Sequence, residues 1–288
     1  MPELPEVEVV KESLESKLKN LTIKRVLINN NKLRYKLNNK EFYKIKGLKI
    51  INIKRRSKYL LINLNQNLTI LAHLGMTGKF FIFDNNKKYK TSFYYSLKKK
   101  DSKHDHLTIF LSNGFKLIYN DVRKFGFLKL FYSQNIYECS HLKFLGPEPL
   151  TKDFNTKYIT NYFLNKKIKI KDLLMNQRFI AGLGNIYCNE ILFLCKINPN
   201  KIVNKINKQE LNKIVKLTKK ILKKAISQGG SSIQNFHSTD GKSGNFQQRF
   251  NVYNRENKKC KTKKCLSIIK KTYTSGRSSF YCPRCQNN

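Results

Sequence analysis

The 288-residue sequence has no long apolar run and few acidic residues. No segment approaches the roughly 20 consecutive apolar residues that a membrane-spanning helix needs. The N-terminus, MPELPEVE, lacks the apolar core of a secretory signal, so we expect a cytoplasmic protein with no membrane contact. Only 18 Asp and Glu residues stand against 58 Lys and Arg, which gives a formal net charge of +40. This excess favours a polyanionic partner such as nucleic acid, although codon bias toward Lys, Asn and Ile also contributes to it.

The cysteines argue against a disulfide framework, because their number, seven, is odd and no secretory signal precedes them. Four of them fall in the last 30 residues, as two pairs: Cys260 with Cys265, and Cys282 with Cys285. Pairs of cysteines separated in this way are typical of one structural zinc ion held by four thiolates on a β-hairpin. We expect the tip of that hairpin near residues 274–277. The alternative is a set of unrelated free thiols.

The first half of the chain combines one helical pattern with many strand-like runs. Val7, Val10, Leu14 and Leu18 have the spacing of one helical face. Seven short runs rich in Ile, Phe and Tyr follow, at 48–53, 59–64, 68–73, 79–83, 107–111, 115–119 and 127–131. They predict an antiparallel β-sandwich or barrel, with a polar loop over 84–105.

The second half changes to helical periodicity. Apolar positions predict helices over 170–174, 186–194 and 211–225, the last of which ends at Gly229-Gly230. We therefore expect an α+β protein of several domains. The predicted boundaries are a β-sandwich domain at 1–133, a linker at 134–150, a helical domain at 151–250 that includes a mobile loop at 229–250, and a zinc hairpin at 251–288.

Weaker signals come from a glycine-rich turn, from two apolar residues that follow strands, and from the N-terminus. The glycine-rich turn AGLGNIY, residues 181–187, ends where a helix should start near Asn185, so its free N–H groups favour an anion, although such turns are often only turns. Met76 and Phe125 follow strands, and Phe125 lies close to Arg123 in sequence. Apolar residues beside a cation are used to unstack DNA bases, but an isolated Met or Phe more often belongs to a core.

The extreme N-terminus is the last candidate. If Met1 is removed, as a small second residue favours, Pro2 carries a free secondary amine. An α-amine has a pKa about 2.5 units below that of lysine, so much more of it is an unprotonated nucleophile at neutral pH. Glu3 beside it is able to transfer protons.

Taken together, these segments resemble the formamidopyrimidine-DNA glycosylases, bacterial repair enzymes that excise oxidised purines. The resemblance follows the chain in order. Its motifs are PELPEVE, RRSKYL, HLGMTG, KHDH, DVRKFG, HLKFLGPEPL, AGLGNIYCNEILF, NVYNRE and GRSSFYCPRC. One departure is the first cysteine pair, which has four intervening residues where the family usually has two.

The resemblance implies roles for single residues. Pro2 would be the Schiff-base nucleophile and Glu3 the general acid, and Lys58 and Arg277 would also serve catalysis. The positions implied to contact DNA are His104, Arg123, Lys166, Asn185 and Tyr253. Those implied to fill the gap left by a flipped base are Met76, Arg123 and Phe125, and those implied to bind zinc are Cys260, Cys265, Cys282 and Cys285. Lesion contacts are expected at Ser231, Ser232 or their neighbours.

The implied function is a bifunctional DNA glycosylase and AP lyase of base excision repair. It would be monomeric and nucleoid-associated, with double-stranded DNA containing oxidised purines as partner and one structural Zn²⁺. The implied fold adds a helix-two-turn-helix motif to the helical domain. Three alternatives remain open: an endonuclease VIII-type glycosylase for oxidised pyrimidines, a non-catalytic zinc protein that binds DNA or RNA, and a cationic ribosome-associated protein.

Overall fold

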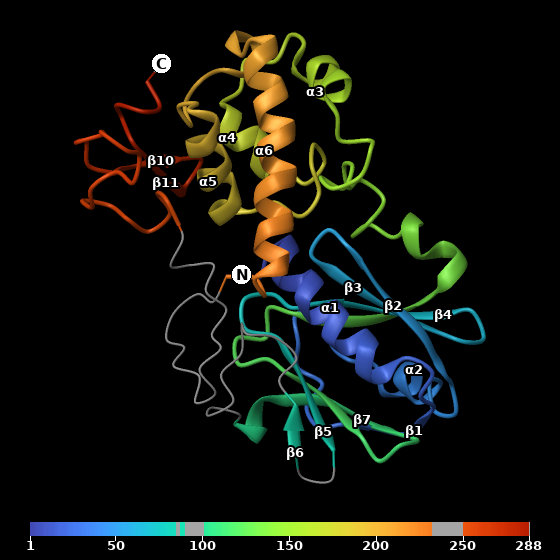
Figure 1. Cartoon of the computed structure of the whole chain (residues 1–288). Helices are drawn as coiled ribbons and strands as arrows, with labels where there is room; N and C mark the ends of the chain where they lie inside the picture. The colour runs from blue at the N-terminus through green and yellow to red at the C-terminus, as the bar shows by residue number, and fades with distance from the viewer. Residues whose placement is uncertain (85–86, 90–100, 232–249, 288) are drawn as a thin grey trace. The chain divides into compact units, whose positions relative to one another are not determined.

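The change of periodicity near the middle of the sequence corresponds to two compact units (Figure 1). In the computed structural model, residues 1–84, 87–89, 101–231 and 250–287 are described. Unit 1 contains Met1–Lys143 and residues 228–231, and unit 2 contains Phe144–Ser227 and residues 250–287. The boundary between the two units, at Lys143 and Phe144, falls within the linker predicted for 134–150. Of the loop predicted for 229–250, residues 232–249 lie outside the described residues.

Helix α1 (Leu4–Leu18) begins at a capping box. The Glu3 amide donates to the Glu6 carboxylate at 2.9 Å, and the Glu6 amide donates back to the Glu3 side chain. Pro5 fits the first turn because its missing N–H would have no partner there. The predicted apolar face, Val7 to Leu18, is fully buried in the core of unit 1.

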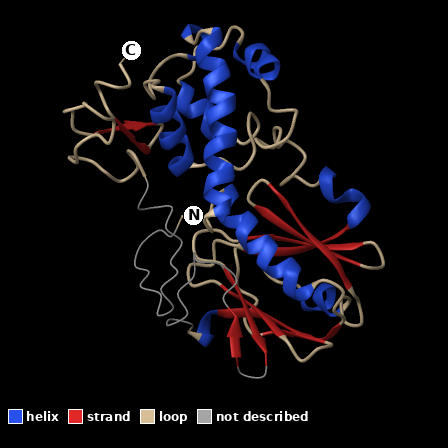
Figure 2. Cartoon of the chain, viewed as in Figure 1, coloured by secondary structure: helices blue, strands red, loops and turns tan. Residues whose placement is uncertain are grey.

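Two antiparallel sheets enclose that core, with α1 packed against β2 and β3 (Figure 2). Within the described residues, one sheet has the strand order β1-β7-β8-β5-β6 and the other has the order β2-β3-β4-β9. The bounds of the first are β1 Ile23–Ile28, β5 Lys79–Asp84, β6 Lys87–Tyr89, β7 Asp105–Leu111 and β8 Lys116–Asn120. Those of the second are β2 Ile50–Arg56, β3 Tyr59–Leu64, β4 Leu68–His73 and β9 Phe127–Tyr132.

The predicted antiparallel architecture is confirmed, and the sequence missed four of its short elements. Strand β1 was missed because Lys24 and Arg25 interrupt its alternation, and both are exposed. Helix α2 (Asn39–Tyr43) is too short to show a period. The segment predicted as a loop over 84–105 contains β6 and a 3₁₀ helix at Ser102–His104, while residues 85–86 and 90–100 lie outside the described residues.

The three predicted helices of unit 2 are present. They are α4 (Ile170–Met175), α5 (Asn185–Cys195) and α6 (Lys208–Ser227), and α3 (Thr156–Phe163) is additional. Helix α5 starts at Asn185, as the glycine-rich turn predicted, with Gly184 at its N-cap. In the part of the chain that is described, no helix is long and apolar enough to cross a bilayer.

The C-terminal hairpin pairs β10 (Lys270–Thr274) with β11 (Arg277–Tyr281). Thr274 pairs with Arg277, so Ser275 and Gly276 form a two-residue turn, and both have positive φ, as a type I′ turn requires. Ile269, just before the first strand, lies fully buried in a small cluster with Val252 and Phe280.

Gly75 is required where two turns of unit 1 press together. Its φ is +56°, and a Cβ there would lie 2.5 Å from both the Gly126 nitrogen and the Phe125 carbonyl carbon. We therefore expect Gly75→Ala to lower the free energy of unfolding by about 3 kcal/mol, measured by urea denaturation. The matched control is Gly47→Ala, with φ +85° and nothing within 4 Å. Equal losses in the two variants would contradict the close approach.

Candidate functional site

The start of the chain is buried in unit 1 among charged groups. Pro2 and Glu3 are both buried, and Glu3 is 3% exposed. Burial lowers the pKa of the Met1 α-amine, and Lys58 and Arg123 lower it further, whereas the carboxylates of Glu3 and Glu6 oppose the shift. Three predicted site residues, Glu3, Lys58 and Arg123, are therefore near enough to the amine to influence its pKa. A desolvated amine of this kind is a good nucleophile.

Glu6 is a site residue that the functional reasoning missed. Its side chain is 1% exposed and accepts hydrogen bonds from the Glu3 amide, and from the Ser231 amide and hydroxyl at 2.7 Å each. These bonds hold Ser231 against the first turn of α1. The signal in the sequence was the Glu3–Glu6 spacing of a capping box. Ser232, the other predicted lesion contact, lies outside the described residues.

Lys58 lies in the tight turn between β2 and β3. The preceding Ser57 has φ 57°, and Lys58 is 6% exposed, so this lysine is not a solvated surface charge. Its charge lowers the pKa of both the Met1 amine and His73. The predicted lysine is therefore near enough to the N-terminal amine to influence its pKa.

Two turns present the predicted wedge residues. Met76 follows β4 and Phe125 follows β8, and their side chains are 38% and 49% exposed. This exposure rules out the core interpretation for both. The Arg123 guanidinium carbon lies 4.7 Å from the centre of the Phe125 ring. The three residues predicted to fill a DNA gap thus share one surface of unit 1.

Asp121 organises the second of these turns. This fully buried carboxylate accepts the Thr77 hydroxyl and the Gly126 amide, and Thr77 Oγ1 in turn accepts the Arg123 amide at 3.0 Å. The Asp121 amide donates to the carbonyl of His104 at 3.0 Å, so the predicted DNA-contacting histidine adjoins the same turn. Sequence reasoning did not identify Asp121.

A pocket of about 630 Å³ opens between these elements. It is lined by Met1, Arg34, His73, Gly75, Met76, Arg123, Lys124 and Phe125. All of them belong to unit 1, and four of them are basic or imidazole side chains. The pocket thus joins the chain start to the exposed wedge residues.

In unit 2, polar side chains donate hydrogen bonds to Ser278 and Ser279, the two residues that follow the exposed Arg277. The Lys171 ammonium, fully buried, donates to the Ser278 carbonyl at 2.7 Å and to the Ser279 hydroxyl at 2.6 Å. Burial lowers the pKa of Lys171 to about 8. The Asn185 side chain also donates to the Ser278 carbonyl, at 3.1 Å. The predicted residues Asn185 and Arg277 are therefore neighbours at the hairpin.

Glu190 plays a similar role for Tyr253. This carboxylate, 1% exposed, accepts the backbone amides of Asn251, Val252 and Tyr253 at 2.8–3.0 Å. Lys166 lies past the end of α3, with its ammonium 4.8 Å from the centre of the Tyr162 ring. Neither Glu190 nor Lys171 was identified from the sequence, because each resembles an ordinary charged residue on a helix.

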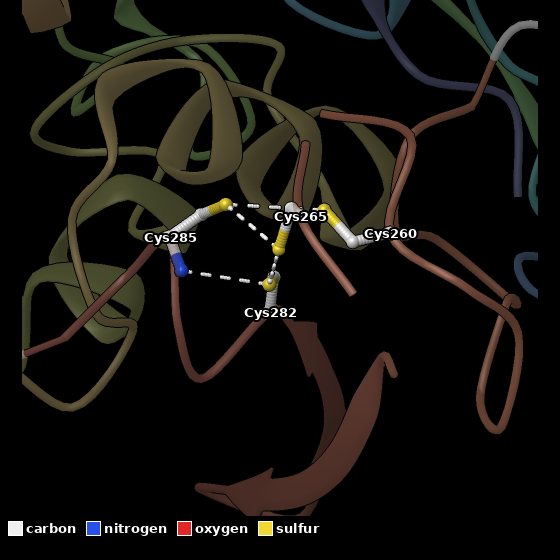
Figure 3. A group of neighbouring side chains, drawn as sticks. All are labelled: Cys260, Cys265, Cys282 and Cys285. Atoms are coloured by element: carbon white, nitrogen blue, oxygen red, sulfur yellow. Dashed lines mark hydrogen bonds between the residues drawn. The ribbon is translucent and has the colours of Figure 1, made fainter. Parts of the chain in front are cut away.

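The four C-terminal cysteines form one cluster (Figure 3). Their sulfur atoms all lie within 4.8 Å of one another, and the closest pairs are 3.6–3.9 Å apart. A tetrahedron with metal–sulfur bonds of about 2.3 Å has edges of about 3.8 Å, so the four thiols fit a metal ion. The Thr262 and Cys285 amides donate to the sulfurs of Cys260 and Cys282. The longer first cysteine pair does not prevent the cluster from forming.

A β-sandwich with a buried Pro-Glu start and a helical unit with a four-cysteine hairpin form the architecture that the resemblance to the DNA glycosylases implies. The formamidopyrimidine-DNA glycosylase N-terminal domain model matches residues 1–128, and the H2TH domain model of the same family matches residues 145–237. The chain belongs to the formamidopyrimidine-DNA glycosylase family.

Individual relatives agree with this assignment. The formamidopyrimidine-DNA glycosylase of Rickettsia bellii is 43% identical over 99% of both chains. That of Hydrogenovibrio crunogenus is 39% identical, over 99% of this chain and 96% of its own. Among solved structures, the Lactococcus lactis Fpg protein in complex with DNA containing an abasic site has a TM-score of 0.85 at 33% identity, covering 99% of this chain and 100% of that one.

The lowered pKa of His73 leads to a prediction about how the stability of the fold depends on pH. Burial, followed by the charges of Lys58 and Arg34, lowers this pKa from 6.5 to about 4. Between these values the unfolded chain binds the proton more tightly, so His73 makes the protein less stable as pH falls from about 6.5 to about 4. We expect this residue to cost up to about 3 kcal/mol over that window. In urea denaturation, His73→Gln should lose less stability than the wild type between pH 7 and 4.5. Parallel curves of stability against pH for the wild type and His73→Gln would contradict this prediction.

Proposed function

We propose that this protein is a bifunctional DNA glycosylase and AP lyase of base excision repair that removes oxidised purines from double-stranded DNA. The observation that carries the proposal is the desolvated N-terminal amine beside Glu3, Lys58 and Arg123. Removal of Met1 transfers the free amine to Pro2, which lies in the same buried surroundings. A secondary amine kept partly unprotonated is suited to attack a sugar carbon.

The chemistry follows from that amine. The unprotonated Pro2 nitrogen attacks C1′, the bond to the damaged base breaks, and the base leaves with a proton. Glu3 protonates the ring oxygen as the deoxyribose opens, which leaves an iminium between Pro2 and C1′. The iminium withdraws electrons and acidifies C2′–H, so the 3′ and then the 5′ phosphate leave by β- and δ-elimination. Lys58 and Arg277 are proposed to bind the phosphates at the lesion, because both are cations. For Lys58, its burial is a further reason.

A base inside a duplex must first leave the stack, which costs a few kcal/mol. The exposed side chains of Met76 and Phe125 would fill the gap and replace part of the lost stacking, and Arg123 would face the opposite base. His104, Lys166, Asn185 and Tyr253 are proposed to contact the DNA backbone. The start of α5 at Asn185 supports this, because its free N–H groups favour a phosphate.

The lesion preference is the finer part of the proposal. The PELPEVE start and the set Met76, Arg123 and Phe125 favour oxidised purines, including 8-oxoguanine opposite cytosine. A solved complex of a Lactococcus lactis Fpg mutant contains DNA with Fapy-dG, and a complex of the wild-type protein contains an oxidised pyrimidine. An oxidised-pyrimidine glycosylase is therefore the second candidate function.

The four-cysteine cluster is proposed to hold one Zn²⁺, which would supply structural cross-linking and no chemistry at the lesion. Cys260, Cys265, Cys282 and Cys285 would be its ligands. We further propose a monomer that acts in the bacterial cytoplasm at the nucleoid, where its DNA substrate is found; the curated relatives named above are bacterial.

Borohydride trapping tests the catalytic proposal. Incubated with a duplex that holds 8-oxoguanine opposite cytosine, the protein should form a covalent complex whose attachment maps to Pro2. Glu3→Gln should lower the rate of its formation by about 10²- to 10⁴-fold. Pro2→Glu, which favours retention of Met1 and removes the prolyl amine, should abolish the complex.

The same experiment separates the alternatives. A parallel duplex with an oxidised pyrimidine that traps more efficiently would keep the mechanism and assign the chain to the endonuclease VIII-type preference. No trapping on either duplex, with Met1 removed according to mass spectrometry, would refute the enzyme and leave a DNA-binding zinc protein.

Metal analysis tests the cysteine cluster. Purified protein should contain one zinc ion per chain, and Cys282→Ser should reduce both the zinc content and DNA affinity by at least about tenfold, because the hairpin that presents Arg277 loses its cross-link. The matched control is Cys139→Ser, a free cysteine outside the cluster. Full zinc content in Cys282→Ser would contradict the site.

A further inference from the structure

Beside the pocket of unit 1 lies a cluster of cationic and aromatic side chains, Arg34, Tyr35, Lys129 and His141, called here the Lys129 cluster. We propose that the Lys129 cluster is an additional binding site for a backbone phosphate of the DNA strand adjoining the lesion. The proposal rests on the function proposed above. It assigns residues that lie outside the nucleophile, wedge and hairpin groups.

The cluster is held together by close contacts. The Lys129 ammonium lies 3.6 Å from the centre of the Tyr35 ring and 3.3 Å from His141 Nε2. The Arg34 guanidinium carbon lies 5.9 Å from the centre of the same ring. Two cations thus share one aromatic ring, and the histidine accepts a hydrogen bond from one of them. The ammonium keeps further protons with which to bind an anion.

The cluster is continuous with the pocket. Arg34 and His73 both line the pocket, and the His73 ring stacks on Phe127, with centroids 5.6 Å apart. Phe127 in turn contacts His141, at 4.6 Å. In the β4–β9 ladder His73 pairs with Phe127 and Leu71 pairs with Lys129, so Phe127 and Lys129 point to the same side of the sheet. The basic surface therefore extends from the pocket along β9.

The charges of the cluster are not neutralised within unit 1. Among the described residues, no ion pair within 4.0 Å joins a carboxylate to Arg34 or Lys129. Burial lowers the pKa of His141, and the charges of Lys129 and Arg34 lower it further. The other titratable groups around it are Tyr35, Tyr59, His73 and Cys139. Like charges packed together in this way disfavour one another unless an anion joins them.

A DNA phosphate has the chemistry to be that anion. A duplex carries one phosphate per about 1.7 Å of axis, so a lesion seated at the pocket brings further phosphates over the surface beside it. Lys129 and Arg34 would contribute charge, and His141 would help to position Lys129 by accepting its hydrogen bond. Because a phosphate carries no base identity, the site would strengthen binding without changing lesion preference.

The test is the salt dependence of binding to a duplex that contains a tetrahydrofuran abasic analogue. Each phosphate contact contributes about 0.9 to the slope of log affinity against log salt. We expect Lys129→Ala to reduce the slope by about this amount and affinity by several-fold, and Lys129→Arg to restore both. Lys129→Met, which keeps the aliphatic packing, should behave like Lys129→Ala and serves if the alanine variant does not fold.

The matched control is Lys116→Ala. Lys116 also lies over an aromatic ring, with its ammonium 5.7 Å from the centre of Phe110, but at the end of β8 remote from the Asp121 turn. Its removal should leave the slope and the borohydride trapping unchanged. Equal slopes for wild type, Lys129→Ala and Lys116→Ala would overturn the proposal, and so would equal reductions in both alanine variants.

A second readout follows His141 itself. In NMR titrations of the histidine ring signals, the pKa of His141 should rise when the duplex is bound, because a phosphate stabilises the imidazolium. An unchanged or lower pKa in the bound state would overturn the site while the trapping reaction still reports the enzyme. A wild type that neither binds the duplex nor traps on it would overturn the proposed function and this inference together.

Discussion

The buried carboxylate of Glu6 is the constraint on which the proposed catalytic end of unit 1 depends. A carboxylate that is 1% exposed is stable only when its oxygens are hydrogen-bonded, and its donors are the Glu3 amide and the Ser231 amide and hydroxyl. Removal of one partner of such a group costs several kcal/mol, so each donor is held in place. The first turn of α1, and with it Pro2 and Glu3, therefore has a fixed position beside residue 231.

The same carboxylate also contributes to the electrostatics of the Met1 amine. Desolvation is the largest influence on the pKa of the Met1 amine and lowers it, while Glu3 and Glu6 raise it and Lys58 and Arg123 lower it. Burial thus prevails over two nearby carboxylates. Lys58 and Arg123 act in the same direction as burial, away from the protonated form that cannot attack a sugar.

In unit 2, buried hydrogen-bonded charges likewise support the elements that are proposed to bind DNA. Lys171 supports the strand that starts at Arg277, and Glu190 supports the segment that leads to Tyr253. The hairpin buries few apolar side chains, because the buried residues of its cluster are Phe193, Val252, Ile269, Phe280 and two of the cysteines, Cys260 and Cys282. A small core of this size gives limited stability by itself, which explains why buried hydrogen-bonded charges and a four-thiol site are both present.

The sequence predicted those features that have a period or a fixed spacing. The apolar face of α1, most of the strands and the four-cysteine cluster all follow from such patterns, whereas β1 and α2 are too irregular or too short. Residue charge alone could not identify Glu6, Asp121, Lys171 or Glu190, since the same letters describe solvated surface residues. What distinguishes them is burial, and burial results from contacts between segments far apart in the chain, such as Glu6 with Ser231.

The net charge of +40 therefore divides into cations with different physical roles. Lys171 is buried and donates to backbone and hydroxyl oxygens, so its charge supports the fold. Lys129 lies against a ring and a neutral histidine with no carboxylate near it among the described residues, so its charge remains available to an anion. A count of lysines treats the two as equal. Because desolvation penalises the first and a bound phosphate would stabilise the second, their substitution should separate stability from the salt dependence of DNA binding.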